Sequence, residues 1–330
     1  MKKPLLEVRS LRTSFHTRGH TVQAVRGIDL RVQKGEILGI VGESGSGKSV
    51  SMKSVIRLVP PSASVSADAV FLEDTDIMAF TDKQMRKVRG SSISMIFQDP
   101  MTSLDPLKRV GTHIEEVLRR HLNMSRAEAA REAVSLLRKV GVPSPETRIS
   151  QYPHEFSGGM RQRVLIAMAL ACHPKLLIAD EPTTALDVTI QAQILHLIRD
   201  LQQQEKMSVI LITHDLGVVA QFCHRIAVMY GGLILEEGTT LEIFESPAHP
   251  YTMALLRSIP SIDETAAKRL QPIEGHPPSL ISPPPGCPFA PRCPDAVPAC
   301  RQAVPDWKRL TDTHQTRCPF CVKEESPCSR

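Results

Sequence analysis

The fold of this chain is decided by the stretch Gly42-Glu43-Ser44-Gly45-Ser46-Gly47-Lys48-Ser49, which follows the apolar run 36–41 and opens a stretch of helical character. The pattern G-x-x-x-x-G-K-[ST] between a strand and a helix is typical of a phosphate-binding loop. Its glycines let backbone N–H groups turn towards an anion, and the helix N-terminus adds its dipole. We expect Lys48 to reach the β- and γ-phosphates of a nucleotide and the Ser49 hydroxyl to ligate Mg²⁺.

Around this loop, short runs rich in Val and Ile alternate with longer stretches of helical character. The expected strands are 36–41, 92–97, 176–180, 209–213 and 225–230. Such near-continuous apolar strands indicate a parallel sheet covered by helices on both faces. Ser125 and Glu128 form a capping box at the start of an amphipathic helix that Gly141 ends, so we expect a helical insertion between two strands.

The run 176–180 ends in two adjacent acids, Asp180 and Glu181. Neighbouring side chains of a strand point in different directions, so the two carboxylates can take different roles. Asp180 suits the Mg²⁺ shell, and Glu181 suits the polarisation of an attacking water. A solvated acidic strand end is the simpler interpretation of this segment alone, but a phosphate-binding loop in the same chain favours the functional one.

Composition narrows the class of protein. The 330 residues include 40 basic and 35 acidic ones, which gives a formal charge of +5. So small an excess argues against a dedicated nucleic-acid binder. No apolar run approaches the roughly 18 residues of a membrane helix, and the start of the chain lacks the apolar stretch of a signal peptide. We therefore expect a cytoplasmic protein whose contact with a membrane is peripheral.

Proline and cysteine concentrate in the last quarter of the chain. Residues 247–330 hold 16 of the 26 prolines, and six of the eight cysteines fall between Cys287 and Cys328. We therefore place a domain boundary near residue 247. In a reducing compartment such a cluster indicates a metal site before it indicates disulfides. The expected ligands are Cys287, Cys293, Cys300 and Cys318, with Cys321 as the rival for the fourth position.

Four thiolates suit either tetrahedral Zn²⁺ or a [4Fe–4S] cluster. The spacing C-x5-C-x6-C-x17-C matches neither the short zinc-ribbon pattern nor the bacterial ferredoxin run, so spacing leaves both open. Scattered free thiols are the plainer alternative. Cys172 and Cys223 lie in apolar helical contexts, and we expect both in the core.

Further short motifs stand in a fixed order between residues 15 and 214. The segment Phe156-Ser157-Gly158-Gly159-Met160-Arg161-Gln162-Arg163 precedes the two acids, and in that position it resembles the signature motif of ABC-type ATPases. It departs from the commoner form of that motif at Phe156 and Met160, but its Ser-Gly-Gly is intact. The other matching elements are Gln98 for the Q-loop, Ala185-Leu186-Asp187 for the D-loop, His214 for the switch histidine and Phe15 for the aromatic residue that stacks on adenine.

The resemblance implies a domain of residues 1–246 with a RecA-like parallel core, an N-terminal antiparallel β subdomain and a helical subdomain at about 105–170. It implies ATP and Mg²⁺ bound between the P-loop of one subunit and the signature motif of another. The implied nucleotide contacts are Phe15, Gly42, Glu43, Ser44, Gly45, Ser46, Gly47, Lys48, Ser49, Gln98, Ser157, Gly158, Gly159, Asp180 and Asp187. The implied Mg²⁺ ligands are Ser49, Gln98 and Asp180, and the implied catalytic residues are Glu181 as base, His214 on the γ-phosphate, and Gln98.

The segments 99–106 and 249–252, with the cysteine-rich tail, resemble the D-type ATP-binding subunits of bacterial dipeptide and oligopeptide importers over essentially the whole chain. Such a subunit pairs with a related second ATPase beneath two permeases that an extracytoplasmic binding protein feeds. The resemblance therefore implies a peripheral protein on the cytoplasmic face of the cell membrane that couples ATP hydrolysis to peptide uptake. It also implies a C-terminal domain, 247–330, in which a [4Fe–4S] cluster is favoured over Zn²⁺.

The sequence leaves alternative functions to consider. Related importers carry nickel, glutathione or other small solutes with nearly the same ATPase. An ABC protein acting on ribosomes or DNA usually has two cassettes or a long coiled-coil insertion, and this chain has neither. A non-catalytic partner subunit is disfavoured because Lys48, Asp180, Glu181 and His214 are all present.

Overall fold

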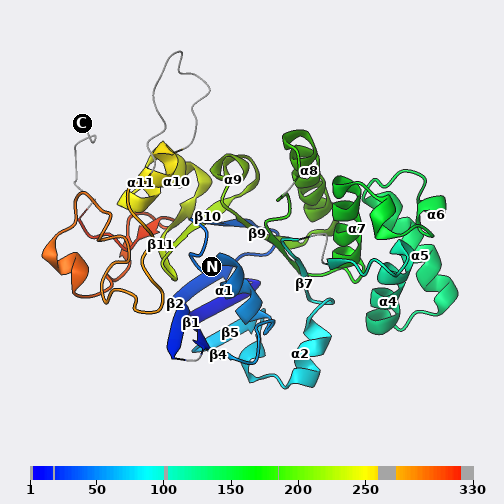
Figure 1. Cartoon of the computed structure of the whole chain (residues 1–330), viewed down its shortest axis with the longest axis horizontal. Coiled ribbons are helices and arrows are strands. Elements are labelled where there is room, and N and C mark those ends of the chain that lie inside the picture. The colour runs from blue at the N-terminus through cyan, green and yellow to red at the C-terminus, as the bar shows by residue number, and fades with distance from the viewer. Residues whose placement is uncertain (1–2, 18, 100–102, 185, 259–272, 321–330) are drawn as a thin grey trace, which may run out of the picture. The chain divides into compact units, whose positions relative to one another are not determined.

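A computed structural model describes residues 3–17, 19–99, 103–184, 186–258 and 273–320 (Figure 1). The chain divides into two compact units. The helical unit consists of Met1–Leu6, Val32–Ile37 and Phe71–Ile212. The P-loop unit consists of Glu7–Arg31, Leu38–Val70 and Thr213–Arg330.

The P-loop unit begins with an antiparallel sheet. Its long strands are β1 (Leu6–Thr17) and β2 (His20–Val32), and β1 pairs antiparallel with β4 (Ala63–Ser66), placing Phe15 opposite Ala63. Buried and accessible residues largely alternate along β1, as expected for a sheet with one face packed on the core. The chain then continues into β5 (Ala69–Leu72), whose last two residues belong to the helical unit and pair antiparallel with β6 (Thr75–Asp76) of that unit.

The second sheet of the P-loop unit contains the strand that leads into the P-loop. All five residues of β3 (Ile37–Val41) are buried, and β3 runs parallel to β10 (Arg225–Tyr230). A Cβ at Gly39 of β3 would lie 2.7 Å from Val219 of the covering helix α9 (Leu216–Phe222), so only glycine lets that helix pack so closely. The other strands of this sheet are β11 (Leu233–Thr239), β13 (Gln315–Thr316) and β12 (Lys308–Arg309), each antiparallel to its neighbour.

Short helices complete the P-loop unit. They are α1 (Lys48–Val55), α9 (Leu216–Phe222), α10 (Thr240–Glu245) and α11 (Pro250–Arg257), with a 3₁₀ turn η3 (Pro298–Arg301). The described part of the proline-rich tail otherwise has little regular structure, as its sequence predicts.

The helical unit is built on three parallel strands, β7 (Ile93–Ile96), β8 (Leu176–Asp180) and β9 (Ser208–Thr213), with β8 in the middle. Its helices are α2 (Asp82–Val88), α4 (Val110–Leu122), α5 (Arg126–Lys139), α6 (Pro145–Arg148), α7 (Gly158–Leu170) and α8 (Val188–Glu205), with 3₁₀ turns η1 (Ile77–Ala79) and η2 (Pro153–Glu155). The predicted capping box of α5 is confirmed, because Ser125 and Glu128 bond each other's backbone N–H. Between β7 and β8 the described chain is helical or irregular, which confirms the expected insertion.

The α/β fold class is confirmed, and the five predicted strands are present with ends shifted by at most one residue. The prediction missed β11, whose central Glu236 and Glu237 are buried although acids disfavour strands. The signal that could have found it is Gly231-Gly232, which links β10 to β11 with both glycines at positive φ, as a two-residue hairpin turn requires. The boundary between 246 and 247 stays a prediction. Of the described helices, none combines the length and apolar character needed to span a bilayer.

Candidate functional site

The P-loop turns tightly between β3 and α1 because three of its residues have no side chain. A Cβ at Gly42 would lie 2.0 Å from the carbonyl oxygen of Met229, and one at Gly47 would lie 2.4 Å from that of Ala24. Gly47 also has a φ of 101°, which favours glycine. Residues with side chains at these positions would force the loop away from the strands that hold it.

The P-loop surrounds the ammonium group of Lys48 and the hydroxyl group of Ser46. The side chain of Lys48 is buried, and its Nζ donates to the carbonyl oxygens of Gly42 (2.7 Å) and Glu43 (2.9 Å). Ser46 Oγ is buried and has no hydrogen-bond partner among the described residues. Ser49 follows in the first turn of α1, where it is half-buried. This loop fits the phosphates of a nucleotide, because it offers a positive charge and a free hydroxyl at a helix N-terminus.

In the helical unit, the carboxyl end of β8 holds the two adjacent acids. Asp180 is the last, fully buried residue of the strand, while Glu181 is half-buried with a φ of 46°. A non-glycine residue at positive φ is strained, and such strain concentrates at functional sites. The strained backbone is held by a hydrogen bond from Glu181 N to the carbonyl oxygen of Ile212 (2.9 Å).

Gln98 and Glu181 lie far apart in the sequence, and the structure brings them together. Gln98 Nε2 donates to Glu181 Oε2 at 2.6 Å, and Thr184 Oγ1 donates to the same oxygen at 3.0 Å. Both donors bind one carboxylate oxygen, which fixes the direction of the other. The side chain expected to act as base is therefore oriented by the residue expected in the Q-loop.

The signature segment packs against the D-loop segment within the helical unit. Ser157 caps α7 by accepting from Met160 N, and Asp187 caps α8 by accepting from Ile190 N at 2.9 Å. A Cβ at Gly159 would lie 2.7 Å from Ile190, and one at Gly158 would lie 3.2 Å from Leu186. These glycines therefore have a packing role in addition to the expected phosphate contact. Ser157 and Gly158 remain exposed, whereas Ala185 lies outside the described residues.

The remaining residues expected at the nucleotide lie in the P-loop unit. Phe15 is half-buried on β1. His214 is exposed directly after β9, and the next residue, Asp215, caps α9 by accepting from Val218 N at 3.2 Å. The P-loop unit thus contains Phe15, the P-loop and His214, while the helical unit contains Gln98, the signature segment, both acids and Asp187.

The four expected cysteine ligands line one cavity of about 600 Å³ in the P-loop unit. Burial raises the pKa of Cys287 to about 11, and the nearby Cys300 and Cys318 thiols add to the effect. Among the residues that the structure describes, no group of three or more His, Cys, Asp or Glu side chains has the arrangement that would hold a metal ion. Cys321 and Cys328 lie outside the described residues. Cys172 and Cys223 are both buried, as predicted.

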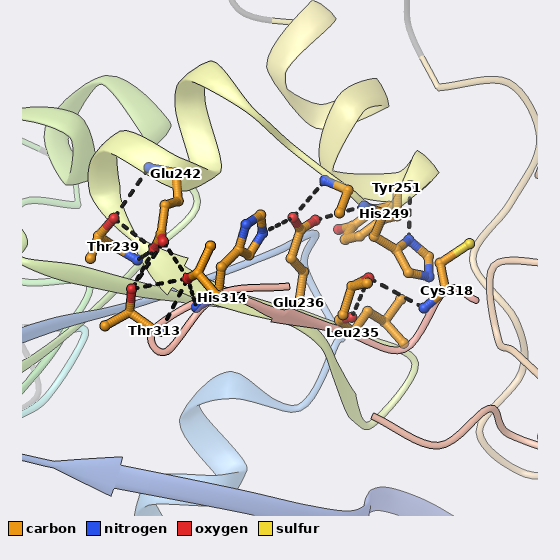
Figure 2. A network of polar contacts seen from close by, with 12 residues as sticks. Leu235, Glu236, Thr239, Glu242, His249, Tyr251, Thr313, His314 and Cys318 are labelled. Carbon is orange, nitrogen blue, oxygen red and sulfur yellow. Dashed lines mark hydrogen bonds and ion pairs between the residues drawn. The ribbon is translucent and has the colours of Figure 1, made fainter. Parts of the chain in front are cut away.

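A buried polar network connects the tail to β11, as Figure 2 shows. Glu236, on β11, is completely buried and accepts from His314 Nε2 (2.7 Å) and from the backbone N–H groups of Ala248 (2.7 Å) and His249 (2.9 Å). Burial lowers the pKa of His249 to about 4, so this imidazole is neutral. Its Nδ1 accepts from Tyr251 N, which leaves the proton on Nε2, 3.9 Å from Cys287 Sγ.

Sequence reasoning missed the contacts between the tail and the P-loop. Glu43 N donates to the Tyr251 hydroxyl oxygen at 2.9 Å, and Arg292 Nη1 donates to the Glu43 carboxylate and to the Tyr230 hydroxyl oxygen at 2.9 Å each. Nothing in the pattern of the sequence links these positions. Tyr251 follows the His-Pro that the resemblance singled out, and Arg292 stands between two expected cysteine ligands.

Comparisons with known proteins agree with this geometry. The ABC transporter family matches residues 25–184, and the oligopeptide/dipeptide transporter C-terminal region matches residues 235–300. A solved structure of the ATP-binding cassette MJ0796, a dimer in a post-hydrolysis state bound to ADP and phosphate, superposes with a TM-score of 0.64 at 27% identity, covering 71% of this chain and 98% of that one. The chain therefore belongs to the ABC transporter family, as an ABC-type ATP-binding ATPase.

Two similar relatives within that family are peptide transport ATP-binding proteins. The Bacillus subtilis "Dipeptide transport ATP-binding protein DppD" is 54% identical over 95% of this chain and 94% of its own length. The "Oligopeptide transport ATP-binding protein OppD" of the same organism is 52% identical over 98% and 92%. These matches place the chain in the branch of the family that carries the oligopeptide/dipeptide transporter C-terminal region.

Proposed function

We propose that this chain is the ATP-hydrolysing subunit of a bacterial importer for dipeptides or oligopeptides. The observation that carries the hydrolytic part is the contact between Gln98 and Glu181, which orients a carboxylate at a strained strand end of an ABC ATPase. The peptide cargo is supported by the names of relatives about half identical to the chain over nearly its full length.

The residues divide the work as follows. Lys48 neutralises charge on the β- and γ-phosphates, the backbone N–H groups of the P-loop cradle them, and Phe15 stacks on adenine. Glu181 takes a proton from the attacking water, and His214 contacts the γ-phosphate. Ser49, Asp180 and Gln98 would hold Mg²⁺, which would neutralise the charge that develops on the phosphate oxygens.

The site is completed by a second subunit. The exposed Ser157 and Gly158 at the N-terminus of α7 form an anion site suited to the nucleotide of a partner, together with Gly159 and Asp187. The dimer of the related cassette MJ0796 supports this arrangement. We propose a related second ATPase as the partner, with two permeases and an extracytoplasmic binding protein, which places the chain peripherally on the cytoplasmic face of the cell membrane.

For the cysteine-lined cavity we propose a [4Fe–4S] cluster held by Cys287, Cys293, Cys300 and Cys318. The cavity is lined by four thiols, which suit either metal group, and the resemblance of the tail to the C-terminal domain of the importer subunits favours the cluster over Zn²⁺. When bound, such a cluster would cross-link four points of a segment that has little regular structure.

The cluster proposal is tested on anaerobically purified full-length protein. We expect iron and acid-labile sulfide in a 1:1 ratio, retained when the core residue Cys223 is replaced by Ser. Protein without both elements would refute the cluster, and zinc without sulfide would establish the alternative metal. Comparing Cys318→Ser with Cys321→Ser identifies the fourth ligand, since only the ligand's loss should lower the iron content.

The cargo is tested by competitive uptake in cells with and without this gene, offering labelled di- and oligopeptides against labelled nickel. We expect deletion to abolish peptide uptake, and we expect the wild type but not Glu181→Gln to restore it. If deletion abolishes nickel uptake and leaves peptide uptake intact, the proposed ATPase activity stands, but the cargo is nickel and not a peptide. If neither changes, the peptide assignment is refuted, and glutathione and other small solutes are offered next.

A further inference from the structure

Glu43, the second residue of the P-loop, is held by three different groups at once. Its carbonyl oxygen accepts from Lys48 Nζ at 2.9 Å, and its backbone N–H donates to the Tyr251 hydroxyl oxygen at 2.9 Å. Its carboxylate accepts from Arg292 Nη1, at 3.1 Å for Oε1 and 2.9 Å for Oε2. One residue therefore joins the P-loop lysine to two residues of the C-terminal region, all within the P-loop unit.

Burial and two further hydrogen bonds hold Arg292 in this position. Its side chain is only 6% exposed, and its Nε and Nη2 donate to the carbonyl oxygens of Glu274 and Ile273, both at 2.9 Å. Arg292 is buried and Glu43 is half-buried, and a hydrogen bond between two charged groups is among the stronger ones in proteins.

Tyr251 is equally fixed, by an aromatic cluster. Its ring is fully buried, with its centroid 4.4 Å from that of Tyr230 and 5.3 Å from that of Phe289. Burial raises the pKa of the Tyr251 phenol, so the hydroxyl stays protonated and its oxygen is available to the N–H of Glu43. The cluster thus presents one oxygen to the P-loop at a defined place.

We propose that Arg292 and Tyr251 are positioning residues of the nucleotide site, which fix Glu43 and through it Lys48 and the entry of the P-loop. The inference rests on the proposed nucleotide site and adds the C-terminal region to the groups that build it. A loop with three glycines loses much conformational entropy when it is ordered around phosphates. Contacts that already hold its first turn lower that cost and so strengthen nucleotide binding.

The test is a double-mutant cycle on the full-length chain, with the affinity for a non-hydrolysable ATP analogue as readout. Arg292→Gln and Glu43→Gln should each weaken binding about tenfold, the scale expected when one charged hydrogen bond is lost. The double variant should be no weaker than either single one, because both remove the same contact. Tyr251→Phe keeps the ring and should weaken binding by a smaller factor, about threefold.

Arg225→Gln is the matched control. Arg225 forms an ion pair with Glu237 in the same unit, at the end of β10 that pairs with Leu38 and not at the end beside Val41, from which the P-loop starts. Arg225→Gln should therefore lower the stability of the fold without changing the affinity for the ATP analogue. Rescue supplies a second readout, since Arg292→Lys keeps the charge and should recover part of the affinity that Arg292→Gln loses.

Three results would overturn the inference: unchanged affinity in Arg292→Gln, additive losses in the cycle, or an equal loss in Arg225→Gln. If Arg292→Gln does not fold, the milder Glu43→Gln and Tyr251→Phe decide the question in the same assay. A wild-type chain that does not bind the analogue would instead refute the proposed nucleotide site. Failure of the inference alone leaves wild-type binding intact.

Discussion

Replacing Glu181 by Gln tests the proposed hydrolytic site with little disturbance of its structure. Gln98 Nε2 and Thr184 Oγ1 donate to one oxygen of the carboxylate, Oε2, at 2.6 and 3.0 Å. The amide oxygen of a glutamine can take the place of Oε2, so both hydrogen bonds are kept. The change therefore removes the negative charge and the proton-accepting capacity of the other oxygen.

We expect Glu181→Gln to keep ATP affinity and to lower turnover about 10²-fold or more. Loss of a general base costs about 10²- to 10⁴-fold, which corresponds to about 2.7 to 5.4 kcal/mol of barrier at 1.36 kcal/mol per tenfold. The side chain is half-buried and keeps its partners, so the midpoint of thermal unfolding should stay close to that of the wild type.

Two measurements on the same preparation check this prediction: equilibrium binding of ATP, and phosphate release when enzyme exceeds ATP. Glu146→Gln is the control, because Glu146 is an exposed acid of the helical unit that pairs with Arg138 on the surface. Its turnover should equal that of the wild type. Normal turnover in Glu181→Gln would remove Glu181 from the role of base, and a parallel loss of ATP affinity would show that the carboxylate acts in binding instead.

Three further predictions concern the P-loop lysine, the signature helix and a core thiol. Lys48→Ala should weaken ATP binding at least about tenfold, because it removes a charged donor, and unchanged affinity would count against the phosphate site. Gly159→Ala should lower the free energy of unfolding by about 1–3 kcal/mol in urea titrations, since its Cβ would lie 2.7 Å from Ile190; Ile190→Ala should restore part of it, and no rescue would contradict the packing argument. Burial raises the pKa of Cys172 from 9.0 to about 11, so at pH 8 its thiolate fraction, and hence its alkylation by iodoacetamide, should be about 100-fold lower than for an unperturbed thiol. The rate should rise with pH up to about 11, and peptide mapping that finds Cys172 as reactive as a free thiol would refute it.

Local patterns correctly predicted five strands of the parallel core and the helix that begins after Ser125. The strands β3, β8, β9 and β10 are short apolar runs whose burial on both faces follows from composition alone. The capping box of α5 was also predictable, because its two partners are three residues apart. In contrast, β11 was not predicted, because two acids stand in its middle. The two glycines of the turn between β10 and β11 were the better indication of this strand.

The site residues were found by the same kind of local pattern, although their roles remain predictions. The P-loop, the two acids after β8 and the signature segment each consist of a few adjacent residues. The sequence pattern could not predict how the side chains of these residues are oriented towards one another. The hydrogen bond from Gln98 to Glu181 joins positions 83 residues apart, and it depends on the pairing of β7 with β8.

The class of protein and five core strands were therefore readable along the chain, because neighbouring residues carry that information. The nucleotide-site motifs were predicted from the same local patterns. The contacts that hold the P-loop in place, in contrast, could be seen only in the folded chain. Tyr251 and Arg292 stand 208 and 249 positions from Glu43, and their contacts arise when β10, α11 and the cysteine-rich tail pack together. No periodicity encodes such a contact, since burial and geometry select these partners only after the intervening elements have formed.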